Sequence, residues 1–205
     1  QVEHPVTELV TGIDLVQWQL RIASGERLSF GQEDVAIDGH AIECRITSED
    51  PDNGFLPSTG RIALLELPAG PGVRWDGAIS EGFEVSLFYD PLLGKLITHA
   101  MDRAGAIARM SRALSELRVM GIETSAGFHR RVMAERDFQR GAIDIRYLET
   151  HPQLLAPEVP DDLAETVAIA AALLEEERRT RRAIRRIGTE PASGTNGWRS
   201  MAWKS

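Results

Sequence analysis

Hydrophobic and polar residues alternate over residues 40–47, where Ile42, Cys44 and Ile46 fall between the polar residues Glu43, Arg45 and Thr47. A period of two is typical of a half-buried β-strand, because successive side chains of a strand point to opposite faces. Further strands are predicted at residues 61–67, 72–75, 83–88 and 92–100. Proline and glycine separate these short stretches, which favours an antiparallel sheet over a parallel sheet with crossover helices.

Four other stretches repeat their hydrophobic residues at helical spacing. The first covers residues 14–24 and begins at Asp14, a good N-cap residue type. Two more amphipathic helices are predicted at residues 107–117 and 128–133. The fourth, residues 161–187, begins with aspartates and ends with arginines, which suits the helix dipole, and its Glu and Arg residues pair at i,i+4 spacing. We expect this last helix to be long and solvated.

The segments between and after these elements complete the predicted architecture. Residues 48–60 are rich in Pro, Asp, Asn and Gly and predict a loop. The polar end of the chain beyond residue 187 predicts a flexible tail that docks through Trp198 and Trp203. The fold class is therefore α+β: an antiparallel β-sheet with packed helices, followed by a long solvated helix and a flexible tail.

Composition and charge narrow the possible functions. The 205 residues carry a formal net charge of -8, which disfavours binding to nucleic-acid phosphates. The arginine-rich run at 178–186 has glutamate partners and no aromatic residues, so it predicts a solvated or partner-contacting helix, with a nucleic-acid contact as the alternative. Cys44 is the single cysteine, which excludes an internal disulfide. With no bilayer-length apolar run and no leader, we expect a cytoplasmic protein without membrane contact.

Three stretches carry a specific resemblance: QVEHPVTELVTGIDLVQWQLRIASGE, GHAIECRITSEDPDNGFLPSTGRI and YDPLLGKLITHAMDRAGAIARM. They look like the C-terminal part of biotin carboxylase, over about residues 1–150. The resemblance implies three parts. Residues 1–38 would end an ATP-grasp region and add a connecting helix, 39–150 would form the biotin carboxylase C-terminal domain, and 151–205 would be a Pro-rich linker, a charged helix and a polar tail.

The opening QVEHP resembles the end of an active-site strand of that family, and the residues before it in the family are not in this chain. The resemblance implies that Glu3 is the general base that deprotonates bicarbonate, and that Gln1 and Val2 bind bicarbonate through an amide and a backbone N–H. His4 lacks the two-histidine spacing of a zinc site, so we expect a hydrogen-bonding role behind Glu3 and assign no metal ligand, with metal binding by His4 as the lesser alternative. Pro5 can begin the next element.

Arg45 resembles the arginine that stabilises the biotin enolate in this family. A guanidinium stays protonated and planar, which suits a fixed donor to a developing oxyanion. The alternative is a structural ion pair with Glu43, two positions away on the same strand face. Cys44 points to the opposite, apolar face and is expected to be inert.

Three further positions are read from the sequence. Ile145 resembles a residue that packs near the adenine, and Arg74 resembles a residue of the family's dimer interface, although Pro71 replaces the aromatic residue expected beside it. The segment LLGKL lacks the spaced glycine and the Ser or Thr of a phosphate loop, so we expect Lys95 to be structural or a surface charge.

The resemblance implies an ATP-dependent ligase that uses ATP, Mg²⁺ and bicarbonate to carboxylate biotin on a biotin carboxyl carrier protein, in concert with carboxyltransferase subunits and with a possible homodimer. The favoured acceptor of the parent complex is acetyl-CoA, for malonyl-CoA and fatty acid synthesis. Because the upstream residues are absent, we expect this chain alone to be inactive and to bind none of these cofactors tightly. The alternative is a non-catalytic dimerisation or docking module of such a complex.

Overall fold

The computed structural model describes residues 4–155 and 161–187, with side chains of the last helix from 165 to 179. It divides into two compact units, Gln1–Pro157 and Glu158–Ser205. The candidate residues Gln1, Val2 and Glu3, and the predicted tail with its two tryptophans, lie outside the described residues.

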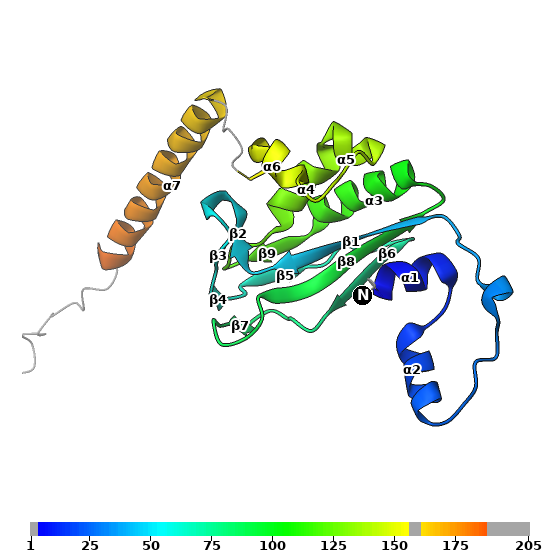
Figure 1. Cartoon of the computed structure of the whole chain (residues 1–205). Helices are drawn as coiled ribbons and strands as arrows, with labels where there is room; N and C mark the ends of the chain where they lie inside the picture. The colour runs from blue at the N-terminus through cyan, green and yellow to red at the C-terminus, as the bar shows by residue number, and fades with distance from the viewer. Residues whose placement is uncertain (1–3, 156–160, 188–205) are drawn as a thin grey trace, which may run out of the picture. The chain divides into compact units, whose positions relative to one another are not determined.

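A three-stranded antiparallel sheet forms the centre of the first unit (Figure 1). Its strands are β1 (His40–Thr47), β8 (Leu92–Ala100) and β6 (Val73–Gly77), in the order β1-β8-β6. In the β1–β8 ladder His40 pairs with Ala100 and Arg45 with Lys95. The antiparallel arrangement confirms the prediction from the short, punctuated strands.

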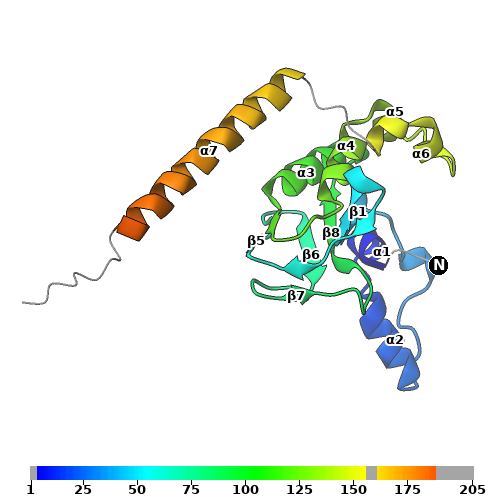
Figure 2. The ribbon, with the colours of Figure 1, turned by 90° about the vertical axis from the view of Figure 1, so that its left-hand side faces the viewer.

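Helices cover both faces of this sheet, and Figure 2 shows α3 (Arg103–Glu116) and α1 (His4–Thr11) on opposite sides of the strands. Toward α3 the sheet contributes Ile42, Cys44 and Ile46 to the main hydrophobic core. On the alternate face Ala41 and Ile97 are buried outside that core, as is Pro5 near the start of α1. The period-two prediction for β1 is therefore confirmed.

The predicted helical stripes pack as expected, with one change at a helix end. Ile107, Met110 and Leu114 of α3 are buried in the core, together with residues of α4 (Ala126–Ala134). Leu117 is also buried, but it is the C-cap of α3 rather than part of the helix. The chain turns there into β9 (Arg118–Met120), which pairs with β5 (Leu64–Glu66) and which the sequence reading missed.

Residues 48–60 are more ordered than the predicted loop. They contain β2 (Glu49–Asp50), paired with β3 (Leu56–Pro57) around the 3₁₀ turn η2 (Pro51–Asn53). The prediction of loop throughout was wrong, because the turn residues 51–55 connect two paired strands of two residues each. A second short pair joins β4 (Gly60–Arg61) to β7 (Glu84–Val85).

The remaining helices of the first unit lie at its two ends. The predicted helix at 14–24 is α2 (Leu15–Ala23), and Asp14 caps it by accepting from the amide of Gln17 at 2.7 Å. Two short α-helices and two 3₁₀ turns were not predicted. Their bounds are α5 (Arg136–Arg140), α6 (Tyr147–Thr150), η1 (Gln32–Asp34) and η3 (Pro152–Leu154).

The second unit contains α7 (Asp161–Ile187), at the bounds predicted from the sequence. Its side chains from 165 to 179 are exposed, and the expected pair of Glu175 with Arg179 is present at 3.4 Å. The side chains of its terminal arginines lie outside the described residues. Among the helices that the structure describes, none combines the length and the apolar character needed to cross a bilayer.

Candidate functional site

The start of α4 hydrogen-bonds to the outer edge of β1 at Arg45. The hydroxyl of Ser125 donates to the carbonyl oxygen of Arg45 at 3.1 Å and accepts from the amide of Thr47 at 3.0 Å. The amide of Ser125 donates to the carbonyl of Thr47 at 3.1 Å. His129 Nε2 donates to the same Arg45 oxygen at 2.9 Å. These bonds fix the backbone from which the Arg45 side chain extends.

The side chain of Arg45 belongs to a group of three charges on one sheet face. Glu43 Oε1 lies 3.7 Å from Arg45 Nε and 3.8 Å from Lys95 Nζ. The Glu43 side chain is only 5% exposed, whereas that of Arg45 is 54% exposed. The ion pair considered as the alternative for Arg45 is therefore present. It is compatible with a catalytic role, because the buried carboxylate orients a guanidinium that still reaches solvent.

Arg74 forms a second polar group on the same face of the sheet. Its guanidinium binds Asp76 through two bonds of 2.7 Å and donates to Glu8 of α1 at 2.6 Å. These bonds, to Asp76 above all, raise the pKa of Arg74 above its ordinary value. All of these contacts lie within the chain and tie α1 to β6. A role at a dimer interface stays a prediction.

The structure brings His4 and Arg74 to one cavity. This cavity has a volume of about 510 Å³, and His4, Glu8 and Arg74 are among its lining residues. His4 is half-buried at the first position of α1, and Pro5 follows at the second, which confirms that Pro5 lies at the beginning of an element. The sequence did not predict that residues 4–11 are helical.

Ile145 lies at a different cavity, beside the outer edge of β1. This edge pocket has a volume of about 550 Å³ and is lined mainly by apolar side chains, including Phe128, Met133 and Ile145. Ile145 is fully exposed in the chain as described. Glu43 and Cys44 also line the pocket. Glu43 thus belongs both to the pocket and to the charged group that contains Arg45.

Burial sets the protonation of two groups at the edge pocket. It raises the pKa of the Cys44 thiol to about 12, with a further rise from the Glu43 charge. The thiol is therefore protonated at neutral pH, and its burial in the core confirms that Cys44 lies on the apolar face of β1. Burial lowers the pKa of His129, although its bond to the Arg45 carbonyl opposes the shift. A neutral His129 with its proton on Nε2 suits the observed bond.

Chemically, this arrangement places a fixed cationic group beside an apolar pocket of small-molecule size. A partly exposed guanidinium with a buried counter-ion can stabilise a developing oxyanion without losing its own proton. The sequence reading named Arg45 and Ile145 but missed Ser125 and His129, because their contacts with Arg45 span about eighty residues. Lys95 was read as structural, and it is paired with Glu43. Only the strand register, in which Lys95 lies opposite Arg45, could have indicated this.

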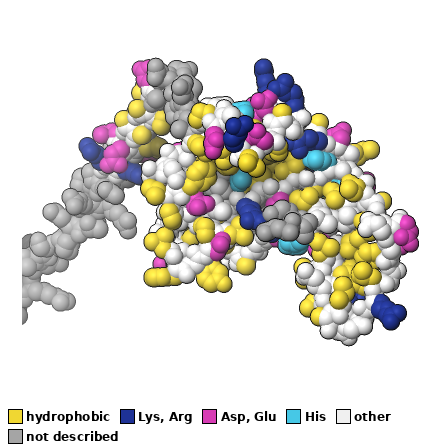
Figure 3. Space-filling view, viewed as in Figure 1, with side chains coloured by type: hydrophobic (Ala, Val, Ile, Leu, Met, Phe, Trp, Pro, Cys, Tyr) yellow, Lys and Arg dark blue, Asp and Glu magenta, His cyan; other side chains and the backbone are white. Residues whose placement is uncertain are grey.

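Two further features are an exposed apolar patch on α2 and a group of possible metal ligands. Hydrophobic side chains gather over α2, at the lower right of the space-filling view in Figure 3. Val16, Leu20 and Ile22 on this helix are each about half exposed or more, and α2 buries none of its residues. Within the described residues, one group of three side chains could hold a metal ion, and it lies around α5 and α6.

Two segments of the chain match models of known protein families. Residues 43–150, more than half of the chain, match the model of the biotin carboxylase C-terminal domain. Residues 1–30 match the model of the carbamoyl-phosphate synthase L chain, ATP binding domain. The two matches cover separate segments of the chain, with residues 31–42 between them.

Individual relatives are similar over most of this chain. It is 43% identical over 174 residues to the 2-oxoglutarate carboxylase small subunit of Hydrogenobacter thermophilus, which covers 85% of this chain and 37% of that protein. It is also 50% identical to the biotin carboxylase of Nostoc sp. over 149 residues. This match covers 73% of this chain and 33% of that protein. The chain therefore spans about a third of the length of these curated relatives.

A solved structure shares the fold. It is the biotin carboxylase domain dimer of H. thermophilus 2-oxoglutarate carboxylase, in complex with MgADP, ADP and bicarbonate. The match has a TM-score of 0.75 at 45% sequence identity and covers 78% of this chain and 35% of that one.

Proposed function

The chain belongs to the biotin carboxylase C-terminal domain family, and on this basis we propose that it supplies the C-terminal part of an ATP-dependent biotin carboxylase. The observation that carries the proposal is the environment of Arg45. Its guanidinium is oriented by the buried Glu43 and extends from a backbone that α4 holds, inside the segment that matches the family. The complete enzyme is a ligase that transfers the carboxyl group of bicarbonate to biotin.

In the proposed reaction, the phosphate that leaves carboxyphosphate accepts the ureido N–H proton of biotin, and Arg45 stabilises the negative charge that develops on the ureido oxygen. A guanidinium meets this need because it donates hydrogen bonds and cannot itself be deprotonated at neutral pH. Biotin is the substrate here, attached to a biotin carboxyl carrier protein. The second charge beside Glu43, the ammonium of Lys95, adds to the positive potential at the site.

Glu3, Gln1 and Val2 complete the proposed site, with Glu3 as the base for bicarbonate and the other two residues as its binding groups. Support comes from the match of residues 1–30 to an ATP-binding domain and from a related structure that contains bicarbonate. His4 stands next to them and lies at the cavity with Arg74, which suits a hydrogen-bonding role.

The edge pocket is the proposed place for the adenine of the nucleotide. Its volume and apolar lining fit a planar base, and the exposed Ile145 would pack against it. ATP would supply the phosphoryl group that activates bicarbonate, and Mg²⁺ would neutralise charge on the phosphates of ATP. The related complex with MgADP supports this choice of nucleotide.

The partners in this proposal are the biotin carboxyl carrier protein and carboxyltransferase subunits, with Arg74 at the interface of a homodimer. A related biotin carboxylase domain is described as a dimer. We propose acetyl-CoA as the acceptor of the parent complex, for malonyl-CoA and fatty acid synthesis in the cytoplasm, because the chain is similar to a protein named simply biotin carboxylase. Relatives that are named for 2-oxoglutarate and pyruvate mark the other acceptors to be assayed.

The second candidate is a non-catalytic module that dimerises or docks a partner. The exposed apolar side of α2 favours it, because a contiguous apolar patch usually marks an interaction surface. On the main proposal the same surface contacts the rest of the ATP-binding region.

The test uses a protein in which this chain follows an ATP-binding region. Bicarbonate-dependent ATP cleavage with free biotin is compared for the parent, Glu3→Gln and Arg45→Ala. We expect each substitution to lower biotin carboxylation by about 100-fold or more, as for the loss of a general base or an oxyanion donor.

Arg112→Ala is the matched control, because Arg112 is an exposed helix arginine paired with Glu116. It should leave carboxylation unchanged. If a folded Arg45→Ala protein carboxylates biotin like the parent, Arg45 is only structural and the module hypothesis replaces the proposal.

A further inference from the structure

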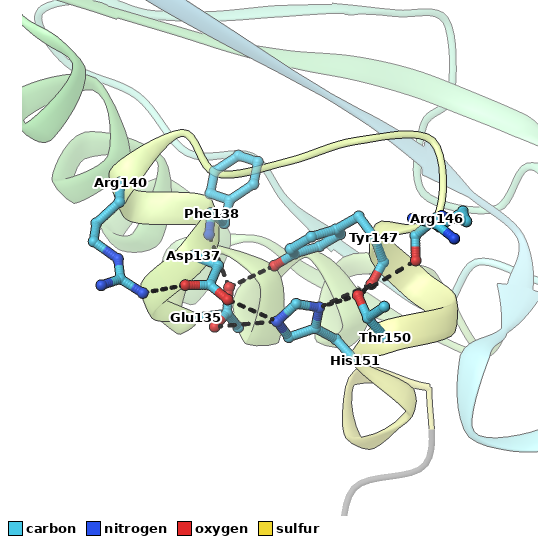
Figure 4. A network of polar contacts seen from close by, with 8 residues as sticks. All are labelled: Glu135, Asp137, Phe138, Arg140, Arg146, Tyr147, Thr150 and His151. Atoms are coloured by element: carbon cyan, nitrogen blue, oxygen red, sulfur yellow. Dashed lines mark hydrogen bonds and ion pairs between the residues drawn. The ribbon is translucent and has the colours of Figure 1, made fainter.

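Three side chains with metal-binding atoms meet at the end of the first unit, outside the charged group around Arg45 (Figure 4). Glu135 is the N-cap of α5, Asp137 lies in its first turn, and His151 is the C-cap of α6. His151 Nε2 lies 3.3 Å from Asp137 Oδ2 and 3.7 Å from Glu135 Oε1. His151 and Glu135 are each 15% exposed and Asp137 is 33% exposed.

The orientation of the imidazole leaves one nitrogen for a cation. His151 Nδ1 lies 2.8 Å from the carbonyl oxygen of Tyr147. A carbonyl can only accept, so Nδ1 carries the proton. In the neutral imidazole Nε2 then presents a lone pair to two carboxylate oxygens. Either a second proton on Nε2, which would donate to Asp137 Oδ2 at 3.3 Å, or a metal ion between these three atoms relieves the repulsion.

In each carboxylate, one oxygen is bound by neighbouring groups and the other oxygen faces the imidazole. Glu135 Oε2 accepts from the amide of Phe138 and from the hydroxyl of Tyr147, both at 2.8 Å, while Oε1 faces the imidazole. Asp137 Oδ1 is bound by Arg140, while Oδ2 faces the imidazole. All three side chains are thus fixed by one atom and point the other toward a common position. Metal ligands are characteristically supported by outer partners of this kind.

The spacing of the facing atoms fits a metal ion. They lie within 4.8 Å of one another. Two ligand atoms that each lie about 2.1 Å from one zinc ion at a tetrahedral angle are about 3.4 Å apart. The Asp137–His151 distance meets this value, and the Glu135–His151 distance exceeds it by a few tenths of an ångström.

We propose that Glu135, Asp137 and His151 bind a divalent transition-metal ion of the zinc class, with water completing its coordination. One imidazole nitrogen and two carboxylate oxygens favour zinc and its neighbours in the first transition row. Mg²⁺ prefers an octahedron of oxygen ligands, so it should compete poorly here.

The position of the ligands gives the ion a structural effect. Two ligands precede residues 141–146 and the third follows them, so a bound ion ties the two ends of this segment together. Ile145 lies in the segment and Tyr147 directly follows it, and both line the edge pocket. Binding of the ion would therefore hold one wall of that pocket in place.

The measurement is isothermal titration of ZnCl₂ into the untagged chain at pH 7.5 after removal of metal with a chelator, with MgCl₂ in a parallel run. We expect about one zinc ion per chain and no comparable binding of Mg²⁺. His151→Gln and Asp137→Asn should each weaken zinc binding by about tenfold or more. Tyr147→Phe keeps all three ligands but removes an outer bond to Glu135, and it should weaken binding less.

His99→Gln is the matched control, because it removes a histidine that instead bonds the carbonyl of Asp38. It should bind zinc like the parent. In an NMR experiment on the parent, zinc should shift the resonance of His151 Nε2. If zinc does not bind, or binds equally well in folded His151→Gln and Asp137→Asn, the proposal is wrong and the position holds only a proton on His151.

Discussion

Arg45 is fixed through its backbone as well as its side chain, and this distinction decides which substitutions should affect it. Its carbonyl oxygen accepts from Ser125 and His129, both of which belong to the start of α4. Its guanidinium lies against Glu43. The position of this side chain therefore depends on residues that our proposal does not place in contact with biotin.

Ser125→Ala removes a donor to Arg45 and the acceptor for the amide of Thr47. Because Ser125 is 3% exposed, water cannot readily replace these bonds. We expect the free energy of unfolding to fall by about 1–3 kcal/mol, measured by urea denaturation. Ser115→Ala is the control, since the Ser115 hydroxyl makes an exposed bond and its loss should cost less than about 0.5 kcal/mol.

His129 makes the stability of the chain depend on pH. Burial lowers its pKa in the folded state below the ordinary value of about 6.5. The unfolded chain therefore binds a proton first as the pH falls, and stability that is present above about pH 6.5 is lost below it. In His129→Gln, which does not titrate, the loss of unfolding free energy between pH 7.5 and 5.5 should be smaller than in the parent.

Urea denaturation at each pH checks this expectation. Other histidines contribute to the absolute slope, including His40, whose pKa is lowered mainly by burial and also by Arg103. The comparison with the variant removes these contributions because they are common to both proteins. Equal slopes in the parent and in His129→Gln would show that His129 gains a proton as easily in the folded state as in the unfolded one.

At the scale of elements, the sequence predicted what depends on local pattern. β1, α3 and α4 each bury one face in the same core. A buried face repeats its apolar residues at a fixed spacing, so the pattern can be recognised within a few residues of sequence. β9, α5 and α6 escaped prediction because each has five residues or fewer, too few to show a period. Their formation depends on tertiary contacts, such as the pairing of β9 with β5.

The stripe of α3 leads to a test of how much the main core contributes. Leu114 is 2% exposed, and Leu114→Ala would leave a cavity under the sheet. We expect the free energy of unfolding to fall by about 2–5 kcal/mol in urea denaturation. On the opposite side of the same helix, Arg112→Ala breaks an exposed i,i+4 pair and should cost about 0.5 kcal/mol or less. Similar losses in both variants would contradict the assignment of Leu114 to the core.

At the scale of the whole molecule, the chain presents about a third of its relatives' length. In our proposal the nucleotide-binding acids and the glycine-rich segment belong to the rest of the complete enzyme. We therefore expect no bicarbonate-dependent ATP cleavage by this chain alone, because the reactants would not be held together. Release of phosphate is the measurement, and turnover above a heat-denatured sample would contradict the division of the site that we propose.

The candidate site could be predicted only where a residue belongs to a recognisable motif. Arg45 and Ile145 were found in that way. The grouping of Arg45 with Lys95 required the strand register, and the metal-binding group of Glu135, Asp137 and His151 required the turn through α5 and α6. The ligands are two and fourteen residues apart in the sequence, and the fold of the intervening segment is what brings them together.

The hydrogen bonds between α4 and β1 also affect how the chain behaves among its own copies. β1 is an outer strand, and unpaired amides and carbonyls on such a strand invite a strand from another molecule. At Arg45 and Thr47 these groups are already occupied by Ser125 and His129. A molecule that opened at this point would expose a template for intermolecular sheet growth, so these bonds also protect the chain against aggregation.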